Sequence, residues 1–220
     1  MKKIISFSLW GSDPKYTIGA IRNAELTKII YPEWIPRFYC AKNSVPDNII
    51  KRLKELGSEI VLKDTSGDWT GMFWRFEAIA DPDVDVMISR DTDSRLSLRE
   101  KLAVDEWLKS GKLFHIMRDH PAHATQILGG MWGAKNPILQ DMNYLINTYD
   151  KKSFWQVDQN FLRDVIYPRV MYSTIVHDEF FEKKPFPKKR DGLEFVGQVY
   201  DSNDISTKIY EDDLKKHLKL

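Results

Sequence analysis

The stretch DVDVMISRDTDSRLSLRE, residues 83–100, contains a largely apolar run followed at once by a charged loop. The segment 84–88 is short and mainly apolar, as is typical of a strand buried inside a sheet. The loop RDTDSR, residues 90–95, places two acids and two arginines at the tip of that strand. Charges of both signs packed this closely predict a bound ligand that combines a cation with an anion.

Strand and helix patterns alternate along the first half of the chain. Because such alternation pairs strands in parallel, we expect an α/β fold with a central, mostly parallel sheet flanked by helices. Ligands of these sheets bind at the carboxyl ends of the strands, which is where the charged loop follows the fourth strand. The expected strands are 3–9, 35–40, 58–62, 84–88 and 113–117, and the expected helices are 15–30, 47–57, 69–80 and 97–111.

The alternation fades in the second half of the chain. Residues 127–134 have the pattern of a strand with a glycine-rich centre, and helices are expected near 137–149 and 155–166. From residue 178 onward the chain is charged and marked by proline, with little periodicity. No repeat or linker divides the sequence, so we expect a single domain over residues 1–220.

The composition limits the classes of function. Thirty-three basic residues against 32 acidic ones leave a formal charge of +1, which gives no support for a nucleic-acid or membrane-surface partner. The one cysteine, Cys40, allows no internal disulfide and is compatible with a reducing compartment. The start resembles a signal peptide, but residues 11–14 end its apolar part, and no run reaches the roughly 18 apolar residues of a membrane span. We therefore expect a soluble, cytoplasmic protein.

Asp91 and Asp93 stand two residues apart, where their carboxylates can converge on one point. Two carboxylates this close repel each other unless a proton or a cation lies between them. Mg²⁺ or Mn²⁺ is commonly held by one or two carboxylates and takes its other ligands from water and phosphates. A solvated acidic turn is the alternative. Phosphatases of the haloacid dehalogenase type also carry D-x-D, but after their first strand and with Thr or Val where this chain has Arg95.

A series of short motifs accompanies the D-T-D motif. In chain order they are SLWG (8–11), YPEW (31–34), WRF (74–76), RDHP (118–121), GGMWG (129–133), VDQNFL (157–162), VHD (176–178) and KKPFPKKR (183–190). With this succession the chain resembles the small glycosyltransferase domain of large algal viruses and some bacteria. More distantly, it is similar to the retaining enzymes related to glycogenin.

The resemblance covers residue 5 to about residue 201. It implies a single GT-A, Rossmann-like domain with D-x-D at the end of the fourth strand. It also implies a nucleotide-binding half, residues 1–95, and a half for the donor sugar and acceptor with a charged tail, residues 96–220.

The same resemblance implies the metal site. Asp91 and Asp93 would hold the ion, and His177 would complete the protein's share of the ligands. A mixed carboxylate and imidazole set fits Mn²⁺ at least as well as Mg²⁺. The alternative for His177 is a structural histidine at the end of a strand.

The nucleotide is expected over the end of the first strand. Leu9, Trp10 and Gly11 end that strand and Tyr16 follows, so an aromatic ring and backbone groups can stack on a base and read it. For Leu9, ordinary core packing is the alternative.

Three arginines are candidates for the donor site. Arg75 lies among aromatic residues and needs a charged partner, since an unpaired buried charge is costly. The Asp91 region or the donor is the partner we expect. Arg90 suits the diphosphate because a guanidinium matches phosphate geometry. Arg190, in a basic run, either closes over the diphosphate or is solvated.

The donor sugar is expected beside Gly129 and Gly130, which let the backbone approach closely, although a β-bulge explains them too. The resemblance places Asp158 on the ring hydroxyls and Gln159 near the anomeric carbon. An acid at a helix start is the alternative for Asp158.

Asp119, His120 and His123 follow the fifth expected strand as a polar cluster. In an inverting reaction, Asp119 or His120 is a candidate base for the acceptor hydroxyl.

The sequence thus predicts a metal-dependent glycosyltransferase that moves a hexose from a nucleotide-diphosphate donor to a glycan hydroxyl. UDP is the nucleotide that the resemblance implies. Two alternatives are a noncatalytic nucleotide-sugar-binding module and a sugar nucleotidyltransferase. The second usually needs a glycine- and arginine-bearing phosphate loop near the start, which residues 9–17 lack.

Overall fold

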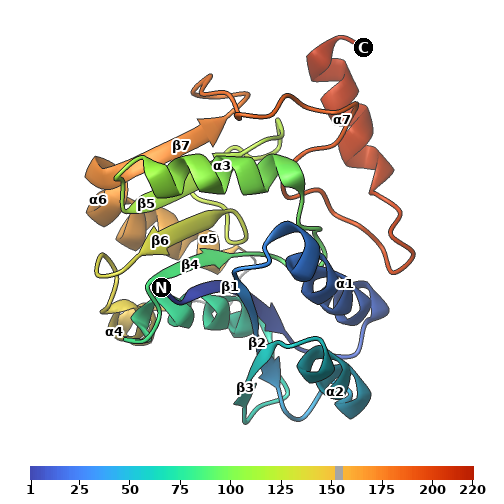
Figure 1. Cartoon of the computed structure of the whole chain (residues 1–220), viewed down its shortest axis with the longest axis vertical. Coiled ribbons are helices and arrows are strands. Elements are labelled where there is room, and N and C mark those ends of the chain that lie inside the picture. Colours follow the sequence, from blue (N-terminus) through green and yellow to red (C-terminus); the bar gives the residue numbers. More distant parts are fainter. Residues whose placement is uncertain (152–155) are drawn as a thin grey trace.

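A seven-stranded sheet forms the centre of the molecule (Figure 1). The computed structural model describes residues 1–151 and 156–220. The strand order is β3-β2-β1-β4-β6-β5-β7; β6 runs antiparallel to β4 and β5, and the other neighbouring pairs are parallel. The strands are β1 Lys3–Leu9, β2 Ile35–Ala41, β3 Glu59–Lys63, β4 Val86–Ser89, β5 Phe114–Arg118, β6 Trp132–Lys135 and β7 Thr174–Asp178.

Helices cover both faces of the sheet, and each face has its own core. Successive residues of a strand point to opposite faces, so Ile5 packs against the first group of helices and Ile4 against the second. The first group is α1 Pro14–Ile30, α2 Asp47–Glu55 and α3 Leu98–Lys109. The second is η1 Trp69–Ala80, α4 Met142–Thr148, α5 Val157–Phe161 with its continuation η2 Leu162–Ile166, and α6 Tyr167–Val170, which η3 Met171–Ser173 follows.

The inner strands are mainly apolar and almost fully buried because both of their faces are covered. Phe7 of β1 stacks on Phe38 of β2 with ring centroids 4.7 Å apart, and Ile5 lies opposite Ile88 of β4. All of these side chains are fully buried. The expected single α/β domain with a mostly parallel sheet is confirmed, and the D-T-D motif follows β4 as expected.

One helix differs in type from the expectation. Residues 69–80 form the 3₁₀ helix η1, whereas their periodicity predicts an α-helix. Within it, the backbone N–H of Arg75 donates to the Ser8 hydroxyl of β1 at 3.0 Å. The Arg75 N–H therefore does not take part in an α-helical backbone hydrogen bond. Its hydrogen bond to Ser8 instead links η1 to the end of β1.

The second half departs further from the expectation. The strand predicted at 127–134 begins only at Trp132, because the glycine pair before it lies in a turn. The helix predicted at 137–149 is shortened to α4, since residues 136–141 form turns. The helix predicted at 155–166 is present from Val157, and residue 155 lies outside the described residues.

The chain ends in the helix α7, Lys208–Leu218, which the sequence pattern did not predict (Figure 1). Among the described residues, no helix is both long enough and apolar enough to cross a bilayer.

Candidate active site

A cleft of about 810 Å³ opens at the carboxyl ends of β1 and β4. A smaller pocket of about 160 Å³ continues it and shares Arg75, Asp91 and Gln159 with it. Both halves of the chain contribute to the walls. The cleft is lined by Ser8, Leu9, Trp10, Gly11, Ser12, Asp13, Tyr16, Trp69, Met72, Arg75, Asp91, Thr92, Asp93, His120, Ala122, His123, Leu128, Gln156, Gln159, Phe195, Gly197, Val199 and Tyr210.

Arg75 joins the two acidic parts of this cleft. Its guanidinium pairs with Asp91 after β4 and lies 3.3 Å from a carboxylate oxygen of Asp158 on α5. Only 6% of Arg75 is exposed. Burial lowers the pKa of the guanidinium, but the charges of Asp91 and Asp158 outweigh this effect and raise it. The cation therefore stays charged, and it fixes both carboxylates relative to β1.

Gly129 and Gly130 make room for this arrangement. A Cβ on Gly129 would collide with Arg75 and Asp158, and one on Gly130 would collide with the Asp91 carboxylate. The sequence predicted that the backbone of these glycines approaches the donor sugar, but in the structure it closely approaches the side chains of Arg75, Asp158 and Asp91. Gly129 lines the small pocket, whereas Gly130 lies behind Asp91.

Asp158 and Gln159 meet the small pocket from the start of α5. Asp158 is 2% exposed. Burial raises its pKa, and this effect outweighs the charge of Arg75, which lowers it. Gln159 is half-buried and lines both the pocket and the cleft. A carboxylate and an amide side by side offer the acceptors and donors that sugar hydroxyls need.

Asp93 is paired with a lysine of α1. The Lys15 ammonium lies 2.8 Å from a carboxylate oxygen of Asp93. Burial, and then the charge of Asp91, raise the pKa of Asp93, while Lys15 lowers it. Lys15 itself lies one residue after the proline that begins α1.

The donor set of the D-T-D motif fits a divalent ion that arrives with phosphate ligands. Asp91 and Asp93 both line the cleft and present hard carboxylate oxygens. In the described parts of the chain, no three His, Cys, Asp or Glu side chains are grouped to hold a metal ion. Two carboxylates suffice for Mg²⁺ or Mn²⁺ when water and phosphates supply the remaining ligands.

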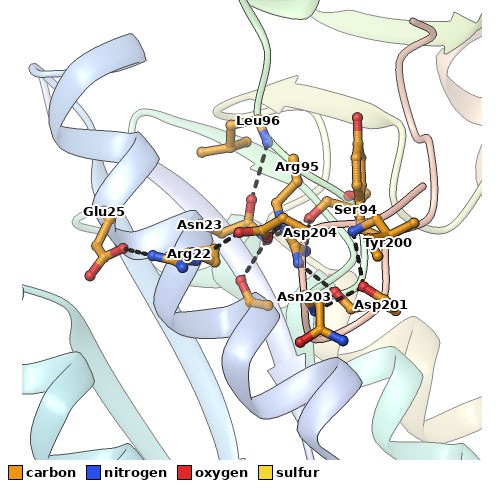
Figure 2. A network of polar contacts seen from close by, with 12 residues as sticks. Arg22, Asn23, Glu25, Ser94, Arg95, Leu96, Tyr200, Asp201, Asn203 and Asp204 are labelled. Atoms are coloured by element: carbon orange, nitrogen blue, oxygen red, sulfur yellow. Dashed lines mark hydrogen bonds and ion pairs between the residues drawn. The ribbon is translucent and has the colours of Figure 1, made fainter.

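The D-T-D loop is fastened to α1 by Asn23 (Figure 2). The buried Asn23 amide donates to the carbonyl of Ser94 at 2.8 Å and accepts from the backbone N–H of Leu96 at 3.1 Å. The helix approaches the loop so closely that a Cβ on Gly19 would collide with the Thr92 carbonyl. Helix α1 therefore sets the position of the motif.

The C-terminal segment is fastened to the same loop (Figure 2). Asp204 accepts from Arg95 at 2.9 Å and from Arg22 of α1 at 3.0 Å. The backbone N–H of Tyr200 donates to the Asp93 carbonyl at 2.8 Å. This segment continues into Tyr210 of α7, so residues late in the sequence form one wall of the cleft.

The residues predicted to receive the nucleotide all line the cleft. Leu9, Trp10, Gly11 and Tyr16 surround its end near β1 and α1. Trp10 packs edge-on against Trp74 with ring centroids 6.1 Å apart, which fixes its indole at the cleft wall.

Two predicted arginines lie elsewhere. Arg90 is 2% exposed and donates to Glu100 at 3.2 Å inside the core, so it is not directed into the cleft. Arg190 binds Asp119 at 2.6 Å and does not line the cleft either. Each arginine pairs with a buried carboxylate of the chain, so neither needs a bound ligand to balance its charge.

His177 also lies apart from the D-T-D motif. It sits on β7, three strands from β4, which is roughly 14 Å at the usual strand spacing. Its Nδ1 is 2.8 Å from Nε2 of His115, and its Nε2 is 3.6 Å from Glu106. Burial lowers the pKa of His177. The structure does not bring His177 together with Asp91 and Asp93, and its contacts are those of a core histidine.

The two candidate bases of the polar cluster are both engaged. Asp119 is fully buried, where Arg99 and Arg190 bind its carboxylate. His120 lines the cleft, but its Nδ1 accepts from Ala122 N–H at 3.0 Å and its Nε2 lies 2.9 Å from the Tyr210 carbonyl. Neither group has a free lone pair directed at an incoming hydroxyl in this arrangement.

His123 lines both the cleft and the small pocket. Its Nδ1 accepts from the backbone N–H of Asp119 at 3.1 Å, so the proton of the neutral ring is on Nε2. Burial, and then the neighbouring His120, lower the pKa of His123 to about 3. His123 is therefore neutral and carries its one N–H donor on Nε2.

Several lining residues were missed by the sequence prediction. Lys15 does not line the cleft but pairs with Asp93, and it was detectable, because it follows the first strand at the same sheet edge as the D-T-D motif. Met72 and Gln156 lie in helices that were expected, but no motif singled them out; the others come from the segment after residue 178, which has little periodicity: Phe195, Gly197, Val199 and Tyr210.

No protein-family model matches the chain, and no curated protein sequence matches it significantly. Solved structures do match. One is a glycosyltransferase involved in the glycosylation of the major capsid of PBCV-1, with a TM-score of 0.53 and 12% identity over 84% of this chain and 91% of that one.

A second similar structure is glucosyl-3-phosphoglycerate synthase from Mycobacterium tuberculosis. Its complex with Mn²⁺, UDP and glucosyl-3-phosphoglycerate has a TM-score of 0.51 and 12% identity, over 86% of this chain and 72% of that one. Its complex with Mn²⁺ and UDP-glucose gives 0.50 and 13%, over 86% and 71%. The chain therefore has the GT-A glycosyltransferase fold, as its motifs predicted.

Replacing Asn23 with alanine is expected to destabilise the protein. The Leu96 N–H would lose its buried partner, and such a group costs about 1–3 kcal/mol when left unsatisfied, whereas the Ser94 carbonyl keeps its hydrogen bond from Arg95. Urea unfolding of Asn23→Ala should show a lower free energy of unfolding. The control is Asn48→Ala on the exposed side of α2, which should change little. Equal stability of both variants would show that Asn23 does not fasten the loop.

Replacing His177 with alanine separates a core role from a metal role. We expect a lower melting temperature, because a nitrogen of the buried His115 loses its partner at a cost of roughly 1–3 kcal/mol. The increase in UDP affinity that Mn²⁺ causes should match that of the wild type in calorimetry. If the variant melted normally but lost the response to Mn²⁺, His177 would belong to the metal site after all.

Proposed function

We propose that the chain is a metal-dependent glycosyltransferase that moves a hexose from a nucleotide-diphosphate donor, with UDP as the nucleotide, to a glycan hydroxyl. The observation that carries this proposal is the Arg75 bridge between Asp91 and Asp158. It places the D-T-D motif and a pocket of about 160 Å³ side by side at the ligand-binding edge of a GT-A sheet.

In this proposal, the nucleotide occupies the part of the cleft formed by residues 1–95. The base lies against Trp10 and Tyr16, whose rings line the cleft and offer stacking surfaces. The diphosphate then reaches the D-T-D motif. The complexes of the Mycobacterium tuberculosis synthase with Mn²⁺ and UDP support this arrangement through the shared fold.

Asp91 and Asp93 would hold Mn²⁺ or Mg²⁺ together with the diphosphate. When bound, the ion supplies positive charge that stabilises the leaving diphosphate. The protein's own contribution is the fixed position of both carboxylates, set by Arg75 and by the contacts of the motif loop with α1.

The sugar is proposed to lie in the small pocket, between Asp158 and His123. Asp158 accepts from sugar hydroxyls and stabilises the positive charge that develops at the anomeric carbon as the diphosphate leaves. His123 donates from Nε2, and Gln159 contacts the sugar from the start of α5. The acceptor enters beside Phe195 and Tyr210, which line the other end of the cleft in residues 96–220.

The proposed metal role of Asp93 is tested by nucleotide affinity. UDP should bind wild type much more tightly with Mn²⁺ than with EDTA, since two carboxylates repel a diphosphate without an added cation. Asp93→Asn should remove most of that difference. Asp83→Asn, at the exposed loop before β4, is the control and should behave as the wild type. Equal UDP affinity with Mn²⁺ and with EDTA in calorimetry would contradict the metal dependence.

The proposed catalytic role of Asp158 is tested by donor turnover. Asp158→Asn should fold and bind UDP with Mn²⁺ as the wild type does, because the group acts on the sugar. Its rate of UDP-hexose hydrolysis or transfer should fall by about 10²–10³, the usual loss when one stabilising group is removed. A rate within about threefold of wild type would reassign Asp158 to structural support of Arg75. The absence of any turnover by the wild type would favour a noncatalytic binding module.

A further inference from the structure

Each carboxylate of the D-T-D motif is bound by a cation of the chain itself. Asp91 pairs with Arg75, and Asp93 accepts from the Lys15 ammonium at 2.8 Å. Asp158 is the third carboxylate of this group and shares Arg75. These three carboxylates and two cations together carry a formal charge of −1.

The two cations differ in their freedom to move. Arg75 is buried, holds two carboxylates and is enclosed by the glycine turn, so it cannot leave without stranding both acids. The Lys15 side chain is 34% exposed and holds Asp93 alone. An ammonium on a flexible, partly exposed four-carbon stem that pairs with a single carboxylate is free to exchange partners.

The surroundings keep Lys15 near the cleft when it leaves Asp93. Its ammonium lies 5.0 Å from the centroid of the Tyr16 ring, which lines the cleft. The backbone position of Lys15 is fixed, because its N–H donates to the N-cap carboxylate of Asp13 at 2.8 Å. A shift of the stem alone therefore moves the charge from Asp93 toward a ligand in the cleft.

We propose that Lys15 is an exchangeable counter-ion of the D-T-D motif. It holds Asp93 until a divalent cation and a nucleotide diphosphate bind, and its ammonium then transfers from Asp93 to the diphosphate. The inference rests on the proposed function. Two consequences follow: Lys15 competes with the metal for Asp93, and it strengthens binding of the metal-bound nucleotide.

Mn²⁺ alone tests the competition. Free Mn²⁺ is measured by electron paramagnetic resonance against wild type, Lys15→Met, Lys15→Arg and Lys28→Met, an exposed charge-removing control on the same helix. A like charge within about 4–6 Å commonly shifts a proton affinity by one pKa unit or more, and we expect a comparable effect on a competing metal ion. Lys15→Met should therefore bind Mn²⁺ roughly tenfold more tightly than wild type, while Lys15→Arg and Lys28→Met should not.

UDP at saturating Mn²⁺ tests the transfer. Calorimetry should show affinity for Lys15→Met about tenfold below wild type, since one charge-assisted hydrogen bond to the diphosphate is lost. Lys15→Arg should retain most of the affinity, because it keeps the charge. Thermal melts of all four proteins should coincide, which shows that the effects do not arise from unfolding.

The outcomes separate this inference from the proposed function. Equal Mn²⁺ affinity of wild type and Lys15→Met overturns the competition, and unchanged UDP affinity overturns the transfer, while the metal dependence stands in both cases. The absence of Mn²⁺ binding to every variant, with UDP affinity that does not respond to Mn²⁺, overturns the metal assignment and the exchange role of Lys15 together.

Discussion

The buried guanidinium of Arg75 is the constraint on which the rest of the site depends. Removing one partner from a buried ion pair commonly costs about 3–5 kcal/mol, and this penalty applies to the Arg75–Asp158 pair, which is buried on both sides. The carboxylate of Asp91 is more exposed and pairs with the same guanidinium. One acid follows β4 and the other begins α5, and the glycine turn before β6 must stay free of side chains to admit them. Three distant segments are thereby brought into one fixed geometry.

Polar contacts of the D-T-D loop also position one wall of the cleft. Backbone of the D-T-D loop accepts from Asn23 on α1 and from the N–H of Tyr200 near the C-terminus (Figure 2). The motif is therefore a junction where β4, α1 and the C-terminal segment meet. Residues that form the far wall, such as Tyr210, owe their position to polar contacts with a loop more than one hundred residues earlier.

The sequence predicted what depends on local pattern and on sheet topology. Apolar runs predicted the buried parallel strands, and the rule that ligands bind at carboxyl ends brought Trp10 and Asp91 to one cleft. The sequence did not reveal the side-chain partners of Arg90, Arg190 and His177, because a charged or polar residue in a sequence does not show which distant residue it contacts. Those partners, Glu100, Asp119 and His115, were supplied by tertiary packing and remove the need for a ligand.

Asp91 and Asp93 do not need a metal ion merely to offset their mutual repulsion. Arg75 and Lys15 already supply a cation to each carboxylate, so the motif is tolerable without an added ion. The three carboxylates and two cations still carry a formal charge of −1 together, which opposes a diphosphate bearing further negative charge. A bound divalent ion changes this net charge from −1 to +1. Because Lys15 can leave Asp93 while Arg75 stays in place, the ion can bind without disturbing the contacts of Arg75 with Asp91 and Asp158.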